Sequence, residues 1–188
     1  MFFKPKLIIN EIKKIDANIK FNFSKEKKLL GTAGAVKKIE NKLGDNFLVI
    51  YSDNLLSFDL KNFINFHFKK RANLSVALYS PENNLFSGLA SSAVEITKNS
   101  KIKSFLENRN NNFKKNRYVN TGAYVLNKEI LKKIPKNKFF DFSTDIFPKL
   151  IKKDFFGYVI EKKGYCLGID TPNTFNLSLE IIKKNKLF

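Results

Sequence analysis

The chain has very little cysteine and histidine, with one residue of each among 188. The single Cys166 cannot form an intramolecular disulfide, so the reducing cytoplasm is the expected location. No apolar run approaches the ~20 residues that cross a bilayer, and the N-terminus has no apolar segment followed by a small-residue cleavage site. We therefore expect no membrane partner. His67 on the apolar side of a predicted helix and Cys166 in a predicted strand are expected to pack in the core, not to serve as ligand or nucleophile.

Acidic residues are also scarce, with 17 Asp and Glu against 35 Lys and Arg, which gives a formal net charge of +18. Such a charge raises the question of nucleic-acid binding, because phosphate contacts depend on accessible Lys and Arg. The lysines are spread over every predicted helix and loop and do not form one stripe, so solvated helix faces are the simpler interpretation. Nucleic acid is therefore an unlikely partner. A positive surface would still attract nucleotides and sugar phosphates.

The length fits one domain, and the 43% hydrophobic content with 20 Phe residues indicates a globular protein. Residue periodicity predicts helices at 6–15, 33–43, 59–70, 128–134, 144–152 and 172–184. It predicts strands at 18–23, 47–51, 74–79, 118–126, 156–161 and 165–169, and two short strands within 83–103. The strand at 47–51 has no polar alternation, which predicts a central strand covered on both faces. Alternating strands and helices predict an α/β sandwich.

Two segments point to phosphate chemistry. Residues 30–35 read Leu-Gly-Thr-Ala-Gly-Ala and open a predicted helix, where backbone N–H groups can approach a nucleotide without obstruction from side chains. The strand at 47–51 is followed by Ser52, Asp53 and Asn54, and α/β folds place ligands at such strand ends. Either segment alone could be a plain turn, but the pair in this order predicts a nucleotide site.

Six segments, in order along the chain, are similar to motifs of the sugar-1-phosphate nucleotidylyltransferases. They are 30–35 (LGTAGA), 49–54 (a strand ending in Gly-Asp, with Ser52 in the Gly position), 105–109 (F-x-E-K-P, keeping Phe105 and Glu107), 119–124 (V-N-T-G-x-Y), 140–150 (D-F…D-x-x-P-x-L) and 168–172 (G-I-D-T-P). Members of this family join a nucleoside triphosphate to a sugar 1-phosphate and release pyrophosphate. The resemblance runs through most of the chain.

The family's opening strand, its G-G-x-G-T-R-L loop and its P-K-x-x-x-P segment have no match here. The resemblance therefore implies one N-terminally truncated, partial domain over residues 1–188. Its expected fold is the Rossmann-like nucleotide-diphospho-sugar transferase sandwich, with a mixed, mostly parallel sheet that lacks a first βα unit of at least ~30 residues. Loss of that strand predicts exposed backbone and apolar groups along 47–51 and along 118–126, and self-association.

The resemblance also implies site roles. Asp53 would be the catalytic residue and a Mg²⁺ ligand, with Asp170 as a second ligand at a neighbouring strand end facing the same cleft. Mg²⁺ needs only one or two carboxylates because it keeps several waters. Asp170 could instead cap the last helix. Gly31, Thr32 and Ala33 would bind the nucleotide, and the sugar would contact Glu107, Asn120, Thr121 and Gly122.

The implied function is nucleotidyl transfer from a nucleoside triphosphate to a sugar 1-phosphate, giving a nucleotide sugar. Catalysis would consist of positioning two polyanions and neutralising charge in an in-line attack. A different class of function is a non-catalytic domain that binds a nucleotide sugar or regulates another protein. A third is a basic nucleic-acid-binding module.

Overall fold

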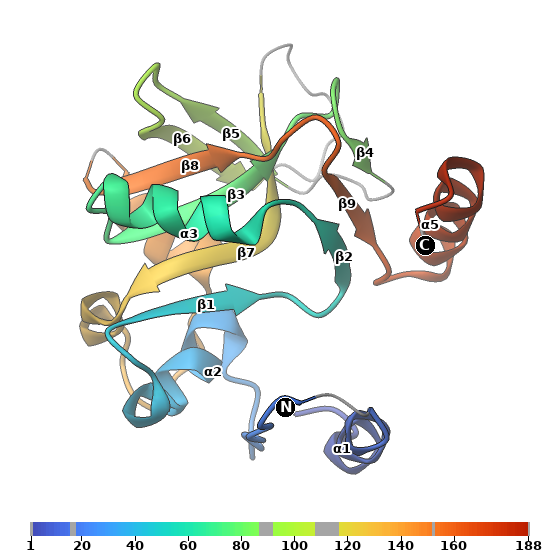
Figure 1. Ribbon diagram of the computed structural model, residues 1–188. Helices are drawn as coiled ribbons and strands as arrows, with labels where there is room; N and C mark the ends of the chain where they lie inside the picture. Colours follow the sequence, from blue (N-terminus) through green and yellow to red (C-terminus); the bar gives the residue numbers. More distant parts are fainter. Residues whose placement is uncertain (1, 16–17, 87–91, 108–116, 152, 188) are drawn as a thin grey trace.

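A four-stranded mixed sheet forms the centre of the protein, seen here in a computed structural model that describes residues 2–15, 18–86, 92–107, 117–151 and 153–187. The strands lie in the order β1 (Asn46–Ile50), β7 (Val119–Asn127), β3 (Leu74–Tyr79) and β8 (Phe155–Val159) (Figure 1). β7 runs antiparallel to both of its neighbours, while β3 and β8 are parallel. Three of the four strands therefore point the same way, and the expected mixed α/β sheet is confirmed.

Two smaller sheets extend this core. β2 (Asn54–Ser57), β9 (Tyr165–Gly168) and β4 (Leu85–Phe86) form a three-stranded sheet, and β5 (Ser92–Ile96) pairs with β6 (Ile102–Glu107). β2 follows β1 after a short turn and runs antiparallel to β9, with Asn54 opposite Gly168. This pairing brings the end of β1 close to the end of β9.

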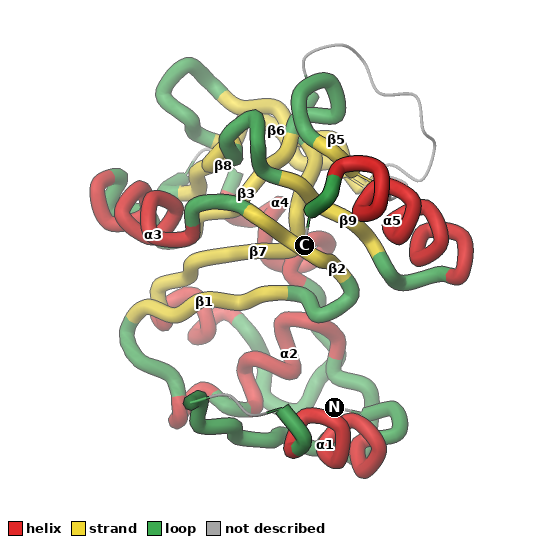
Figure 2. The backbone as a smooth tube through the Cα atoms, turned by 45° about the vertical axis from the view of Figure 1, so that its right-hand side comes forward, coloured by secondary structure: helices red, strands yellow, loops and turns green. Residues whose placement is uncertain are grey.

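Helical segments cover both faces of the central sheet (Figure 2). On one face lie α2 (Gly31–Lys38), η2 (Lys128–Lys133), η3 (Phe142–Ile146) and α4 (Phe147–Leu150), and on the other lies α3 (Leu60–Lys69). The 3₁₀ turn η1 (Glu40–Lys42) follows α2, α5 (Pro172–Asn185) packs beside β9, and α1 (Pro5–Lys13) has no buried residue. Successive residues of β3 face opposite sides, as the pleat requires. Val76 packs with Ala33 of α2 and Phe147 of α4, while Ala77 packs with Phe63 of α3. These two apolar clusters, one on each face of the central sheet, form the hydrophobic core of the α/β sandwich.

Helix α3 shows how the local sequence sets an element. Asp59 is the N-cap, and its Oδ1 accepts a hydrogen bond from Asn62 N at 2.8 Å. One turn apart, Phe63 and His67 are buried. His67 Nδ1 lies 3.0 Å from Ser75 Oγ, and its Nε2 lies 3.3 Å from Asn46 Oδ1. The prediction of a core histidine is confirmed, and burial lowers the pKa of His67 below its usual value.

Several predicted elements differ in the structure. Residues 18–23 form no strand, because their alternating pattern has no neighbouring strand to pair with among the described residues. The predicted helix at 128–134 is a 3₁₀ helix, and the one at 144–152 begins as the π-helical turn η3 before α4.

The position of β1 is a further correction. It was predicted to be central and covered on both faces, but it is an edge strand, and Ile50 is 50% exposed. The expected exposure along 47–51 is thus seen at Ile50. The same expectation for 118–126 is wrong, because β7 pairs on both sides and its residues 119–126 are buried apart from a half-buried Asn120.

Within the part of the chain that the structure describes, no helix is both long and apolar enough to cross a membrane.

Candidate functional site

The loop that opens α2 is held by close backbone contacts with the segment before η3. Gly31 has φ +70°, and a Cβ built there would lie 2.6 Å from the Phe140 carbonyl oxygen. Ala33 N and Gly34 N both donate to that oxygen, at 2.9 and 3.0 Å, and Phe140 N donates to Leu30 O at 2.9 Å. Only glycine fits at position 31, since both the left-handed backbone and the close approach exclude a side chain.

Thr32 connects the same loop to the Asp-Phe motif. Its backbone N and its Oγ1 both donate to Asp141 Oδ1, at 2.9 and 2.6 Å. Thr32 Oγ1 in turn accepts from Phe142 N at 3.0 Å. The first N–H groups of a helix lack intrahelical partners. In α2 those of Thr32, Ala33 and Gly34 are satisfied by the protein itself, which corrects the expectation that the Thr32 and Ala33 N–H groups point at a nucleotide.

Tyr51 joins the end of β1 to the turn in β7. Its N donates to Gly122 O at 3.0 Å, and its ring lies edge-on to Tyr124 with centroids 5.5 Å apart. Gly122 has φ +80°, and a Cβ there would come within 3.0 to 3.1 Å of the Tyr51 side chain. The packing of Tyr51 therefore requires glycine at position 122. The sequence pattern placed Tyr51 in a strand but predicted no role for it.

Burial raises the pKa of Tyr51, and the charges of Asp141 and Asp53 raise it further, while hydrogen bonding with the Thr32 and Tyr124 side chains lowers it. The net shift is upward. The Tyr51 phenol is therefore protonated at neutral pH and can donate a hydrogen bond.

Asn120 and Thr121, two of the predicted sugar contacts, form hydrogen bonds that stabilise β7 around Gly122. Asn120 Nδ2 donates to the Tyr124 hydroxyl at 2.7 Å, and its Oδ1 accepts from Gly122 N at 2.9 Å. Thr121 is fully buried; its Oγ1 donates to Ala77 O at 3.0 Å and accepts from Ala123 N at 3.2 Å. The Thr121 side chain cannot reach a sugar, so that prediction is corrected to a structural role. Asn120 keeps unused hydrogen-bonding capacity.

Thr32 and Asp53 share one groove. It has a volume of about 330 Å³ and is lined by Thr32, Val49, Ile50, Tyr51, Ser52 and Asp53. Residues from two motifs that are separated by about twenty positions in sequence therefore meet at the end of β1. Glu107 is the last residue of β6, and its side chain lies outside the described part of the structure, so its sugar contact stays a prediction.

Asp53 and Asp170 lie at neighbouring strand ends. Ile169 N donates to Asp53 O at 2.9 Å, directly beyond the pairing of Asn54 with Gly168. Asp170 Oδ1 accepts from Thr174 Oγ1 at 2.9 Å, next to the capping box that Thr171 and Thr174 form at the start of α5. The N-cap of α5 is thus Thr171, and the preceding Asp170 stabilises the cap by accepting the hydrogen bond from Thr174.

No cluster of three or more His, Cys, Asp or Glu side chains that could hold a metal occurs among the described residues. A pair of carboxylates is nevertheless a donor set that suits Mg²⁺, which takes oxygen ligands and retains water. Asp53 and Asp170 flank the adjoining ends of β2 and β9, but only Asp53 lines the groove, so the expected cleft shared by both carboxylates stays a prediction.

The comparisons with known proteins agree with the motifs. A family model described as nucleotidyl transferase matches residues 4–167. The chain is 28% identical over 159 residues to a D-glycero-alpha-D-manno-heptose 1-phosphate guanylyltransferase of Aneurinibacillus thermoaerophilus, covering 84% of this chain and 65% of the relative. It is 31% identical over 127 residues to a UTP–glucose-1-phosphate uridylyltransferase of Synechocystis, covering 66% of this chain and 32% of the relative.

The fold has solved counterparts. A crystal structure of HddC from Yersinia pseudotuberculosis superposes with a TM-score of 0.79 at 25% identity, covering 96% of this chain and 76% of that one. A second structure of that protein, complexed with GMP-PN, gives a TM-score of 0.77 at 24% identity. The matched region covers less than two thirds of the length of each of the two curated relatives, the guanylyltransferase and the uridylyltransferase.

Proposed function

Because the chain belongs to the nucleotidyl transferase family, we propose that it serves the transfer of a nucleotidyl group from a nucleoside triphosphate to a sugar 1-phosphate, giving a nucleotide sugar and pyrophosphate. One observation carries the proposal. Thr32 from the first motif and Tyr51, Ser52 and Asp53 from the second line a single groove at the end of β1.

The nucleotide occupies this groove. Gly31 allows the loop to pack closely on Phe140 and so positions Thr32 in the groove, and the protonated Tyr51 phenol is a hydrogen-bond donor in the same wall. The sugar lies toward β7 and β6, where Asn120 uses its remaining donor and acceptor for sugar hydroxyls, together with Glu107. Gly122 contributes by holding Asn120 Oδ1 through its N–H. The protein's part in the reaction is to hold two polyanions in line for attack on the α-phosphorus.

Asp53 and Asp170 are the residues that would hold Mg²⁺. The ion would supply charge neutralisation on the phosphate oxygens. The chain's own residues position the reactants: Asp141 fixes Thr32, and Gly122 fixes Tyr51. Asp53 is the catalytic carboxylate in this scheme because it lines the groove directly.

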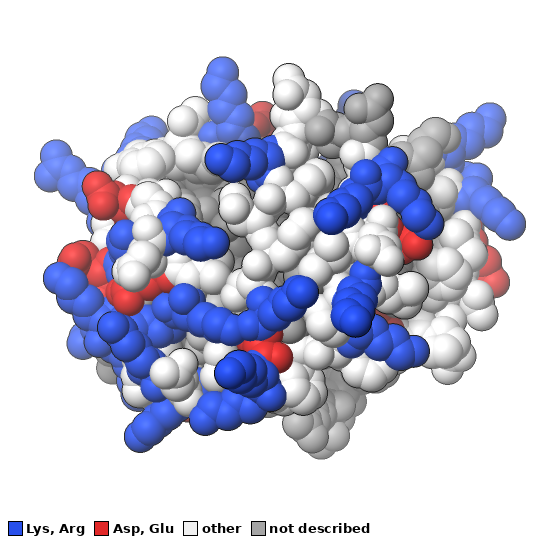
Figure 3. All heavy atoms as spheres, turned by 90° about the horizontal axis from the view of Figure 1, so that it is seen from below, with Lys and Arg blue, Asp and Glu red and all other residues white. Residues whose placement is uncertain are grey.

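The charge distribution supports small phosphate ligands over a nucleic-acid duplex. Lys and Arg side chains are scattered in several groups over the face shown in Figure 3, with acidic side chains among them, and do not form one stripe. A net charge of +18 draws anionic reactants to the protein without selecting a polymer. We place the reaction in the cytoplasm, since the chain has a single cysteine and so cannot form an intramolecular disulfide.

The test is an assay of pyrophosphate release. The purified chain is incubated with Mg²⁺, each nucleoside triphosphate and a panel of sugar 1-phosphates. Release that Asp53→Ala abolishes and Asp45→Ala leaves unchanged supports transfer, because Asp45 is an exposed carboxylate at the opposite end of β1. Saturable binding of a nucleotide sugar without release supports the binding or regulatory alternative. Absence of both contradicts the proposal.

A further inference from the structure

We propose that a lysine-lined hollow beside α2 binds a small anion with several phosphate groups, of the inorganic diphosphate class, at a site separate from the nucleotide groove. The hollow lies between residues 20–25 and residues 38–43 and has a volume of about 600 Å³. Small-molecule sites typically have volumes of about 300–1,000 Å³. The hollow is therefore large enough for a phosphate-rich ligand, and its charge selects the kind of ligand.

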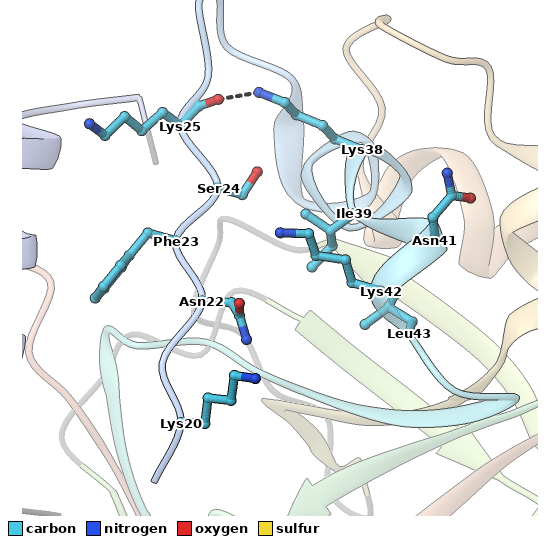
Figure 4. A pocket seen from close by; sticks show the side chains of 10 residues that line it. All are labelled: Lys20, Asn22, Phe23, Ser24, Lys25, Lys38, Ile39, Asn41, Lys42 and Leu43. Carbon is cyan, nitrogen blue, oxygen red and sulfur yellow. Dashed lines mark hydrogen bonds between the residues drawn. The ribbon is translucent and has the colours of Figure 1, made fainter.

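The lining of the hollow carries charge of one sign. It contains Lys20, Lys25, Lys38 and Lys42 and no Asp or Glu. In Figure 4, the ammonium groups of Lys20 and Lys42 point into the space between the two segments. Lys38 spans the hollow at one end, where its Nζ donates to the Lys25 carbonyl oxygen, while the Lys25 side chain points away. Three ammonium groups from two separate segments therefore surround one space.

Compensation of a helix dipole is the simpler explanation for part of this charge. Lysines in the last turn of a helix stabilise it, because the C-terminal carbonyl groups carry partial negative charge. Lys38 is the last residue of α2 and serves in this way. Lys20, by contrast, lies in a segment that forms neither helix nor strand. Dipole compensation therefore does not explain why Lys20 and Lys42 point into the same space.

The neighbouring Lys37 shows the contrast with a lysine that has an internal counter-ion. Its Nζ lies 2.8 Å from Glu40 Oε2, and hydrogen bonding by Lys37 lowers the pKa of Glu40. Glu26, the acidic residue nearest to Lys25 in sequence, accepts from Leu30 N at 3.2 Å. Neither carboxylate lines the hollow. Like charges repel, so an anion between the lysines of the hollow would be stabilised by all of them.

The side chains of the hollow favour phosphate over other anions. A lysine ammonium is a compact charge with three donors, which suits the oxygens of a phosphate group. Asn22 points into the hollow and adds an amide donor, while Ile39 and Leu43 add apolar wall. Clefts of one charge with walls of low dielectric concentrate the field on a bound ion. A single carboxylate would neutralise one lysine, whereas a diphosphate has enough charge and oxygen atoms to contact several at once.

The hollow and the nucleotide groove are distinct sites. They share no lining residue. Thr32 lines the groove near the start of α2, and Lys38 lines the hollow at the end of the same helix, with a rise of about 9 Å along the axis between them. Anion binding in the hollow is therefore independent of the proposed function.

The experiment is a calorimetric titration of the chain with sodium pyrophosphate, in the absence of nucleotide and divalent cations. We expect saturable binding at one site, weakened at least fivefold when the ionic strength is raised from about 0.1 to about 0.5 M, because salt screens exposed charges. Sodium acetate should show no binding. ATP is titrated separately: affinity equal to that of pyrophosphate assigns the site to phosphate groups carried by a nucleotide, and weaker affinity assigns it to the free anion.

Single-charge substitutions identify the lysines involved. Lys20→Gln and Lys42→Gln should each weaken pyrophosphate binding at least fivefold, and Lys42→Arg, which keeps the charge, should bind within twofold of the wild type. Both positions are exposed, so neither substitution removes a buried side chain. Lys163→Gln is the matched control, because it removes the same charge from an exposed turn between β8 and β9; it should bind as the wild type does.

Amide chemical shifts locate the ion. Pyrophosphate should shift the amide resonances of residues 20–25 and 38–43 and leave those of residues 51–53, at the nucleotide groove, unchanged. Shifts at 51–53 in place of those at the hollow would put the anion in the groove and overturn the proposal.

Four further outcomes overturn it: no saturable binding, equal binding of acetate, binding that neither glutamine variant of the hollow weakens, or a loss with Lys163→Gln as large as with Lys42→Gln. The last would mean that pyrophosphate responds only to the overall charge. Since the pyrophosphate titration contains neither Mg²⁺ nor a nucleotide, its failure leaves the proposed function untouched, and failure of nucleotidyl transfer leaves the anion site untouched.

Discussion

Thr32 and Asp141 are separated by 109 positions in sequence, yet one carboxylate oxygen of Asp141 accepts from both the backbone N and the Oγ1 of Thr32. The contact ties the loop that opens α2 to the segment that opens η3. It also fixes the threonine that lines the candidate nucleotide groove. The two motifs therefore act as one structural unit.

Thr32→Val should destabilise the protein. The substitution keeps the shape of the side chain but removes one donor to a charged acceptor and one acceptor for Phe142 N, and we expect a loss of about 1–3 kcal/mol in the free energy of unfolding. Urea denaturation measures it. Thr144→Val is the matched control, because its hydroxyl is exposed and lies 3.4 Å from Asp145; a loss there as large as at Thr32 would contradict the assigned contact.

Gly122→Ala should be costly for two reasons. The residue has φ +80°, and the new methyl group would press on the Tyr51 ring at 3.0 to 3.1 Å. We expect a loss of about 1–3 kcal/mol, typical of strained backbone. Gly44→Ala is the control, since its φ is not positive and the nearest atom to its Cβ is 3.6 Å away. Equal melting temperatures for the two variants would refute the packing of Tyr51 against Gly122.

Stability should depend on pH through His67. Burial lowers the pKa of His67, so between its folded and unfolded pKa values the unfolded chain binds more protons. The contribution of this residue is therefore complete above the unfolded value of about 6.5 and decreases as the pH falls below it toward the folded pKa. Urea denaturation of the wild type at pH 7.5 and 5.5 should show this loss. His67→Gln should flatten the dependence in that window, and an unchanged slope would mean that His67 does not titrate as described.

Divalent-cation binding should require both carboxylates at the adjoining strand ends. We expect Asp53→Asn and Asp170→Asn each to weaken Mn²⁺ binding, as a paramagnetic probe for Mg²⁺, by at least tenfold. Asp45→Asn should leave it unchanged. If Asp170→Asn lowers only the helicity of α5 and not ion affinity, the carboxylate serves the Thr174 contact alone.

Short-range patterns predicted much of the fold. The N-cap Asp59 set the start of α3, and the apolar run at 74–79 gave β3 with the same bounds. The alternation at 18–23 was misleading, because a strand exists only when a partner pairs with it, and pairing is not encoded within the segment. The apolar run at 47–51 likewise could not show that one side of β1 lacks a neighbour.

For the candidate site, the motifs predicted that Thr32 and Asp53 would come together, and the groove contains both. The sequence could not show that the N–H groups of Thr32 and Ala33 are taken by Asp141 and Phe140, since those partners lie more than a hundred positions away. It also gave no role to Tyr51. The signal for it was present in Gly122, a glycine in a strand, which often marks a close approach by another group.

The most direct test of the proposed site is a calorimetric titration of the chain with guanosine and uridine nucleotide sugars in the presence of Mg²⁺. We predict saturable binding to at least one of them, weakened at least tenfold by Asp53→Ala and unchanged by Asp45→Ala. The contrary result is no saturable binding to any nucleotide sugar, together with tight binding to nucleic acid that falls steeply with salt and is unaffected by Asp53→Ala. That outcome would mean that the positive surface binds nucleic acid and that the groove at the end of β1 does not bind a nucleotide sugar.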